Sequence, residues 1–88
     1  MTAPPDPHES RRKRLLWRSS HRGIKEMDLL MGGFAVRHVG AMSESQLTAF
    51  EVLIEVPDQE LFSWVTGEAT VPDDFKNEVL PEFIKFRP

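Results

Sequence analysis

The sequence predicts an all-α protein: a single domain built as a small bundle of about five helices with short connections. Apolar residues recur at three- and four-residue spacings along most of the chain, and glycines and prolines separate these periodic segments. No segment alternates between polar and apolar residues for long enough to form a strand. The chain has 88 residues, enough for one domain that buries roughly 60% of the surface of its unfolded chain.

The chain begins with a proline-rich stretch that does not fit a helix. Residues 1–8 include Pro4, Pro5 and Pro7 and few apolar residues, a composition typical of disorder. We therefore expect a disordered lead-in over 1–8 and a helical domain over 9–88. The first helix is predicted at Glu9–Ser20. Its buried side is expected to consist of Leu15, Leu16 and Trp17.

The second helix is predicted from about Ile24 to His38. Its core-facing stripe is expected to comprise Ile24, Met27, Met31 and Phe34, with Leu30 beside it. Gly32 and Gly33 lie within this helix, where each glycine costs about 1 kcal/mol relative to alanine. Either the helix bends there or a neighbouring segment packs too closely for a side chain. Gly40 is a candidate for the C-terminal stop.

The third helix has the clearest start in the chain. Ser43 and Gln46 have the spacing of a capping box. The apolar stripe that follows consists of Leu47, Phe50, Leu53 and Ile54. Pro57 is expected to close this helix and to begin the fourth, because proline suits the first helical position.

Glycine and proline also bound the last part of the chain. Gly67 is predicted to end the fourth helix, whose packing residues include Leu61 and Trp64, and residues 68–71 form a loop. A last helix is expected to start at Pro72 and to be interrupted by Pro81. Its inner side would comprise Phe75, Val79 and Leu80, with Phe83, Ile84 and Phe86 in a further turn or an irregular tail.

Composition excludes several classes of function. The chain has no cysteine, so it contains neither disulfides nor thiolate metal sites. The three histidines, His8, His21 and His38, have no metal-ligand partner at helical spacing. No nucleophile–base pair and no glycine-rich phosphate loop are present, so we expect neither an enzyme nor a stably bound cofactor. No apolar run approaches the ~20 residues of a membrane span.

Charge divides the chain into a basic and an acidic half. Residues 1–40 hold eight Lys/Arg and four Asp/Glu, whereas residues 41–88 hold three and ten. The cluster Arg11–Arg14 has two interpretations. It is either a nucleic-acid patch, as in an antitoxin or nucleic-acid adaptor, or a solvated helix face near a partner surface. The acidic second half and the lack of an aromatic platform favour the second interpretation, so nucleic-acid binding is not expected.

Aromatic side chains raise a similar choice between binding and packing. Trp17 and Trp64 could stack on a flavin ring, but their ordinary role in a helical bundle is in the core. We therefore expect both to be core residues.

The segment His21–Phe34 is the strongest candidate for a functional site. Gly23 can serve as the N-cap of the second helix, with Glu26 reaching back to it as in a capping box. This structural interpretation does not explain Arg22. The alternative is that Gly23 leaves a bare main-chain spot between Arg22 and Glu26, where another protein finds a guanidinium and a carboxylate.

The motif resembles that of a known family. Arg22-Gly23-x-x-Glu26, followed by Asp28 and an apolar helix ending at Phe34, is similar to the motif of the FAD assembly factors of the SdhE type, also called succinate dehydrogenase assembly factors. The resemblance continues through Leu47–Val56 and through Pro57-Asp58-x-x-Leu61-Phe62-x-Trp64 to Gly67 and Pro72. It covers roughly residues 10–80.

The resemblance implies a partner and a task. Such factors bind the flavoprotein subunit of succinate dehydrogenase, and in some bacteria that of fumarate reductase, and promote covalent attachment of FAD to a histidine of that subunit. FAD would belong to the partner, and the bond would form without a reacting group from the factor. The partner-binding residues implied are Arg22, Gly23, Glu26 and Asp28. The expected compartment is the bacterial cytoplasm, with the mitochondrial matrix as second choice.

Overall fold

The computed structural model describes residues 6–88, which form five α-helices and two short 3-10 helices, η1 and η2, without a strand. In chain order the elements are α1 (Glu9–Ser19), α2 (Lys25–His38), η1 (Val39–Ala41), α3 (Glu44–Ile54), α4 (Asp58–Thr66), η2 (Asp73–Phe75) and α5 (Leu80–Lys85). This confirms the predicted all-α bundle of about five helices. The predicted disordered lead-in lies mostly outside the described residues.

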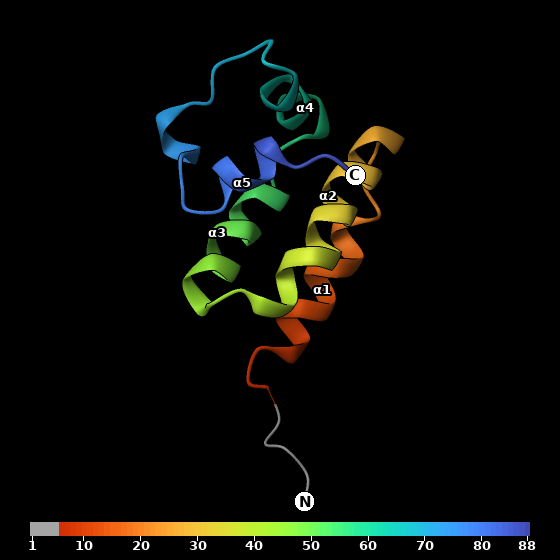
Figure 1. Cartoon of the computed structure of the whole chain (residues 1–88), viewed down its shortest axis with the longest axis vertical. Coiled ribbons are helices and arrows are strands. Elements are labelled where there is room, and N and C mark those ends of the chain that lie inside the picture. The colour runs from red at the N-terminus through yellow and green to blue at the C-terminus, as the bar shows by residue number, and fades with distance from the viewer. Residues whose placement is uncertain (1–5) are drawn as a thin grey trace, which may run out of the picture.

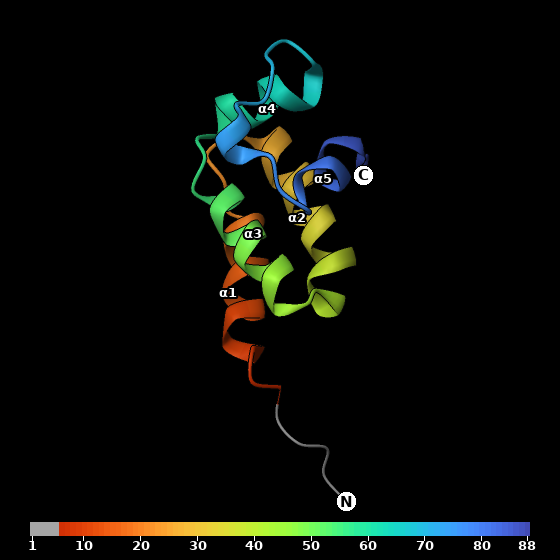
Figure 2. The same ribbon diagram turned by 90° about the vertical axis from the view of Figure 1, so that its left-hand side faces the viewer.

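Helices α1, α2 and α3 stand side by side and form the body of the bundle (Figures 1 and 2). Helix α4 lies at the end of the molecule away from the start of α1, and α5 packs between α3 and α4. The core between these helices is apolar. Its largest fully buried side chains include Phe34, Phe50, Phe83, Met27, Met31, Leu47, Leu53 and Leu61.

Glycines set the distance between α2 and its neighbours. A Cβ atom on Gly32 would lie 3.2 Å from the Ser20 Cβ and 3.3 Å from the Ser20 Cα, at the end of α1. A Cβ atom on Gly33 would lie 3.2 Å from the ring of Phe86. Close packing against the end of α1 therefore explains Gly32, whereas the close neighbour of Gly33 is a single aromatic side chain.

The start of α3 and the end of α4 follow the prediction. The Ser43 side chain accepts from the Gln46 N–H, and the Gln46 side chain accepts from the Ser43 N–H, which completes the capping box. Gly67 ends α4 with a φ of 81°, a left-handed conformation that favours glycine. By contrast, the prediction for Gly40 is wrong, because this residue lies within η1 and has no positive φ.

The last helix differs from the prediction. It starts at Leu80 rather than at Pro72, and Pro81 lies in its first turn instead of interrupting it. Proline is tolerated there because the first N–H groups of a helix have no intrahelical acceptor. The side-chain oxygen of Asn77 accepts from the N–H groups of Val79 and Leu80, each at 2.9 Å, and so marks the start of the helix.

The predicted buried side of α1 is also partly wrong. Leu15 is buried, but Leu16 lies at the surface and Trp17 is 62% exposed. Trp64, by contrast, is buried as predicted. Because α1 is covered on one side only, by α2 and α3, just one of three consecutive apolar residues reaches the core.

Candidate partner-binding site

The Arg22-Gly23 pair lies in the short loop between α1 and α2. Helix α2 begins one residue later than the predicted cap: its N-cap is Ile24, in extended backbone conformation and without a side-chain cap. The predicted capping box of Gly23 and Glu26 is therefore wrong. The Gly23 N–H points instead to a carboxylate of another helix.

The largely buried side chain of Arg22 connects the α1–α2 loop to the end of α3 and to the start of α4. We call the hydrogen-bonded cluster of Arg22, Asp58 and the carbonyls of Ile54 and Val56 the clamp. Its Nε donates to Oδ1 of Asp58 at 2.6 Å, and the two side chains are only 9% and 13% exposed. Its two terminal nitrogens donate to the main-chain oxygens of Ile54 at 2.6 Å and Val56 at 2.7 Å. These carbonyls lie at the end of α3, where a helix leaves its last acceptors without intrahelical donors. The expectation of a free guanidinium at position 22 is therefore wrong.

The second oxygen of the same carboxylate holds Gly23. Asp58 Oδ2 accepts from the Gly23 N–H at 2.5 Å. A Cβ atom on residue 23 would lie 2.9 Å from this oxygen, which is shorter than the contacts that Cβ atoms make in proteins. One carboxylate at the start of α4 thus binds both residues of the pair.

Asp28 completes the loop from the other side. Its carboxylate accepts from the main-chain N–H of Arg22, which ties the loop back to the first turns of α2. Asp28 is half-buried. Its negative charge also lies near the positive end of the helix dipole.

Glu26 alone among the four predicted residues presents its charge to solvent. It is exposed, and within residues 6–88 its carboxylate has neither an ion pair nor a hydrogen bond. Leu29 and Val36 follow it at spacings of three and ten residues, so they share its face of α2. They are 55% and 77% exposed. This face joins a free carboxylate to exposed aliphatic side chains.

A groove lies beside the clamp. It has a volume of about 350 Å³, and its lining residues are Trp17, Arg18, His21, Arg22, Gly23, Ile54, Glu55, Val56, Pro57 and Asp58. The rings of Trp17 and His21 stack with centroids 4.0 Å apart. Arg18 pairs with Glu55 at 2.6 Å and, as hydrogen-bond donor, lowers the pKa of that carboxyl. The groove therefore combines an exposed aromatic pair with a polar rim.

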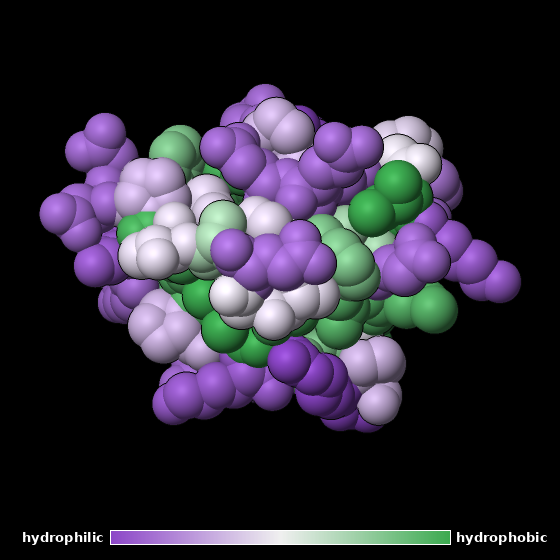
Figure 3. Space-filling view, turned by 90° about the horizontal axis from the view of Figure 1, so that it is seen from above, coloured by the Kyte–Doolittle hydropathy of each residue, from purple (hydrophilic) through white to green (hydrophobic). Residues whose placement is uncertain are grey.

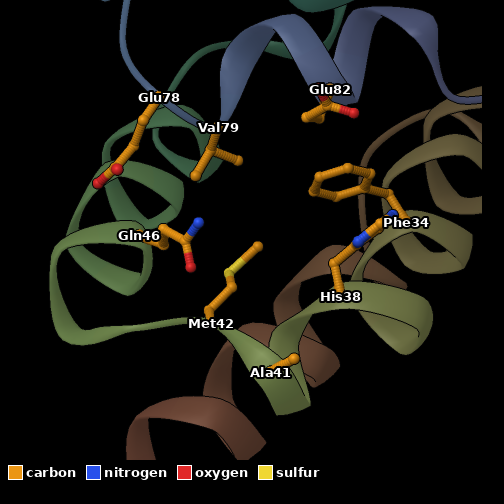
Figure 4. Close-up of a pocket in the computed structure, with 8 residues that line it drawn as sticks. All are labelled: Phe34, His38, Ala41, Met42, Gln46, Glu78, Val79 and Glu82. Atoms are coloured by element: carbon orange, nitrogen blue, oxygen red, sulfur yellow. The ribbon is translucent and has the colours of Figure 1, made fainter.

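A second cavity, of about 180 Å³, lies between α2, α3 and α5 (Figure 4). The residues lining it are Phe34, His38, Ala41, Met42, Gln46, Glu78, Val79 and Glu82.

Over residues 6–88 no group of three His, Cys, Asp or Glu side chains is placed to hold a metal ion. Nor does any helix in that range have the length and apolar character needed to cross a membrane. Seen from the end that carries α4, hydrophobic surface is broken up by hydrophilic side chains (Figure 3).

Most basic residues of α1 are neutralised by carboxylates. Three arginines form ion pairs with carboxylates outside α1: Arg11–Glu51 at 2.7 Å, Arg12–Asp6 at 2.7 Å and Arg18–Glu55 at 2.6 Å. Lys13 pairs with Glu9 at 3.1 Å within the helix. These pairs oppose a phosphate-binding role, which requires free cations.

Sequence reasoning missed two features of this site. Asp58 was named only within the Pro57-Asp58 segment of the family resemblance, although it is the central acceptor of the clamp. Trp17 was assigned to the core, although it lines the groove. The available signal was the Pro57-Asp58 pair, which places a carboxylate at the first position of α4, but its partners lie 35 and 36 residues away.

Comparison with known proteins now decides the family. Residues 13–87 match the family described as flavinator of succinate dehydrogenase. The chain belongs to this family. The resemblance seen in the motif is thereby confirmed, and the flavinator family is one of assembly factors, as the expectation of a non-enzymatic role requires.

Relatives of this flavinator-family chain occur in mitochondria and in bacteria. Succinate dehydrogenase assembly factor 2, mitochondrial, of Dictyostelium discoideum is 43% identical over 72 residues, covering 82% of this chain and 51% of the relative. The FAD assembly factor SdhE of Acetobacter pasteurianus is 36% identical over 76 residues, covering 86% and 70%. Succinate dehydrogenase assembly factor 2 of Saccharomyces cerevisiae is 34% identical over 78 residues, covering 85% and 48%. The chain spans about half the length of the two mitochondrial relatives.

Proposed function

We propose that this chain binds the flavoprotein subunit of succinate dehydrogenase, and of fumarate reductase where a cell has one, and promotes covalent attachment of FAD to that subunit. The observation that carries the proposal is the match of residues 13–87 to the flavinator family. FAD belongs to the partner, and the factor supplies no reacting atom. Holding the flavin and the acceptor histidine in a reactive arrangement can lower a barrier by several kcal/mol.

The four motif residues would divide the work of docking. Glu26 is the residue that contacts the partner, because its carboxylate is exposed and has no partner within the described chain. Arg22, Gly23 and Asp28 serve the interface through the main chain, since they fix the loop from which α2 starts. Leu29 and Val36 extend the contact along the same face of α2.

The compartment proposed for the chain is the bacterial cytoplasm, with the mitochondrial matrix as the second choice. Relatives of both kinds support this pair of alternatives. Expression in bacterial and yeast hosts that lack their own factor would show in which one the chain restores flavinylation.

The test is in-gel flavin fluorescence of the flavoprotein subunit in cells whose own assembly factor has been deleted. The wild-type chain is expected to restore the fluorescent band, whereas Glu26→Ala is expected to restore it weakly or not at all. Glu68→Ala is the matched control, since Glu68 is an exposed glutamate in the loop after α4. A wild-type chain that leaves the subunit without covalent flavin would rule the proposal out.

A further inference from the structure

The carboxylate of Asp58 joins two parts of the chain that are far apart in sequence. Its two oxygens accept from Arg22 Nε at 2.6 Å and from the Gly23 N–H at 2.5 Å. The side chains of Arg22 and Asp58 are largely buried, with 9% and 13% of their surface exposed. Removal of the carboxylate would leave a buried guanidinium without its counter-charge and a main-chain N–H without its acceptor, and each of these is unfavourable.

The need for glycine at position 23 follows from this contact. Gly67 is the only glycine with a positive φ in the described part of the chain, so the backbone at Gly23 is open to other residues. What excludes a side chain is the Asp58 oxygen, 2.9 Å from the position of a Cβ atom. The contact with Asp58 is a reason for glycine at position 23 that lies within the molecule, while the residue itself remains exposed.

The clamp also fixes where α2 begins. Arg22 is held by Asp58 and by two carbonyls at the end of α3, and Asp28 in α2 binds the Arg22 N–H from the opposite side. Glu26 lies in the first turn of α2, between these attachments. Its position relative to the rest of the bundle therefore depends on the clamp.

We propose that Asp58, which lies outside the motif, is a positioning residue for the docking of this chain: it holds the Arg22-Gly23 loop and thereby presents Glu26 to the partner. The docking part of this inference rests on the proposed function. The intramolecular part does not, because it concerns the isolated chain. The two parts are therefore tested by separate experiments.

The first experiment is a double-mutant cycle on the isolated chain, with urea unfolding as the measurement. Gly23→Ala is expected to lower the urea midpoint in the wild-type background. In an Asp58→Ala background the same substitution is expected to change the midpoint little, since the clashing oxygen is gone. An equal decrease in both backgrounds would show that the glycine is needed for another reason, and would overturn the proposal.

The second experiment compares affinity for the purified flavoprotein subunit. Asp58→Asn keeps the size of the side chain but removes its charge, and is expected to weaken binding about tenfold or more. Ser43→Ala is the matched control, because it destabilises the chain at the cap of α3, away from the loop. Both variants are measured at a temperature where circular dichroism shows them folded.

The outcomes separate the two proposals. If Asp58→Asn binds the subunit as tightly as Ser43→Ala does, Asp58 is only a structural residue and the inference is wrong. If the wild-type chain itself fails to bind the subunit, the proposed function and the docking role fall together. The unfolding cycle still decides whether Asp58 is the reason for Gly23.

Discussion

Arg12 and Arg22 have the same role at two places in the molecule. Arg12 donates to the main-chain oxygens of Val39 at 2.5 Å and Met42 at 3.0 Å, just after α2. Arg22 likewise donates to the main-chain oxygens of Ile54 and Val56 at the end of α3. Each guanidinium also pairs with an aspartate. The planar fork of arginine suits this task, because several N–H groups can donate at once in fixed directions.

Substitution of Arg22 is therefore expected to act on stability. Arg22→Gln would remove the charged donor to Asp58 Oδ1 and the donors to the carbonyls of Ile54 and Val56 in a largely buried site. Loss of one partner of such a pair costs about 3 kcal/mol or more. For a domain of this size, this corresponds to a fall in Tm of more than about 10 °C.

Thermal unfolding followed by circular dichroism measures this effect. Arg18→Gln serves as the control, since the pair of Arg18 with Glu55 is exposed and is expected to contribute little. Equal Tm values for the two variants would contradict the assignment of Arg22 as the buried clamp.

A second prediction at the residue scale concerns pH. The hydrogen bonds from Arg11 lower the pKa of Glu51 below its ordinary value of 4.5. Because the folded state holds the Glu51 proton less tightly than the unfolded state, this contribution is fully present above pH 4.5 and is lost as pH falls through the lowered pKa. Stability should therefore decrease on acidification below that value.

Urea unfolding at pH 7, 4 and 3 tests this sign. Glu51→Gln is expected to flatten the decrease in the free energy of unfolding between pH 7 and pH 3. Glu68→Gln, an exposed loop residue, should leave the slope as it is in the wild type. A slope unaffected by Glu51→Gln would refute the role of the Arg11 pair.

At the scale of elements, the two glycines of α2 give opposite predictions. Alanine is favoured over glycine inside a helix by about 1 kcal/mol. At position 33 the tight neighbour is the ring of Phe86, which can rotate away, so Gly33→Ala should raise the free energy of unfolding by up to about that amount. At position 32 the neighbours are the Cβ and Cα atoms of Ser20, which cannot move without shifting the end of α1. Gly32→Ala should therefore lower the free energy of unfolding.

Urea unfolding of the two variants checks the difference. Because both substitutions add the same methyl group to the same helix, each serves as the control for the other. Destabilisation by Gly33→Ala as large as that by Gly32→Ala would contradict the distinction between a side-chain and a main-chain neighbour.

The elements also show how far the sequence predicts the fold. The start of α3 was predicted, because Ser43 and Gln46 are local signals that need no tertiary contact. Its end was predicted less closely: α3 stops at Ile54, and Pro57 is the N-cap of α4 rather than its first helical residue. The start of α5 was not predicted, since Pro81 is compatible with either interrupting or beginning a helix. The hydrogen bonds from the N–H groups of Val79 and Leu80 to the side chain of Asn77 favour a start at this point.

The site was predicted less completely, for a physical reason. The motif identified the right loop, but exposure of a side chain depends on partners elsewhere in the chain. Arg22 is buried because Asp58, 36 residues later, lies beside it. Trp17 is 62% exposed because no helix of residues 6–88 covers its side of α1. Neither fact can be obtained from the residues adjacent in sequence.

At the scale of the whole molecule, the uneven charge along the sequence becomes a set of contacts. Basic residues of α1 pair with carboxylates of α3 and of the α3–α4 connection, including Arg11 with Glu51 and Arg18 with Glu55. Together with Arg22–Asp58, three ion pairs thus join the basic and acidic halves within residues 6–88. This arrangement favours protein binding over nucleic-acid binding.

A binding assay checks this conclusion. Fluorescence anisotropy with a labelled duplex at low salt is expected to show no saturable binding by the wild-type chain. Saturable binding that weakens as salt increases, and that is lost when Arg14 and Arg18 are replaced by glutamine, would revive the nucleic-acid alternative.

The central claim is that the motif is divided: the Arg22 side chain is held inside the molecule by Asp58, whereas the Glu26 carboxylate is directed outward. The most direct measurement is the affinity of Glu26→Gln for the purified flavoprotein subunit, determined by isothermal titration calorimetry alongside its Tm. The account predicts a loss of about tenfold or more in affinity, roughly 1.4 kcal/mol, with an unchanged Tm. Wild-type affinity in this variant, or a fall in Tm like that of Arg22→Gln, would contradict it.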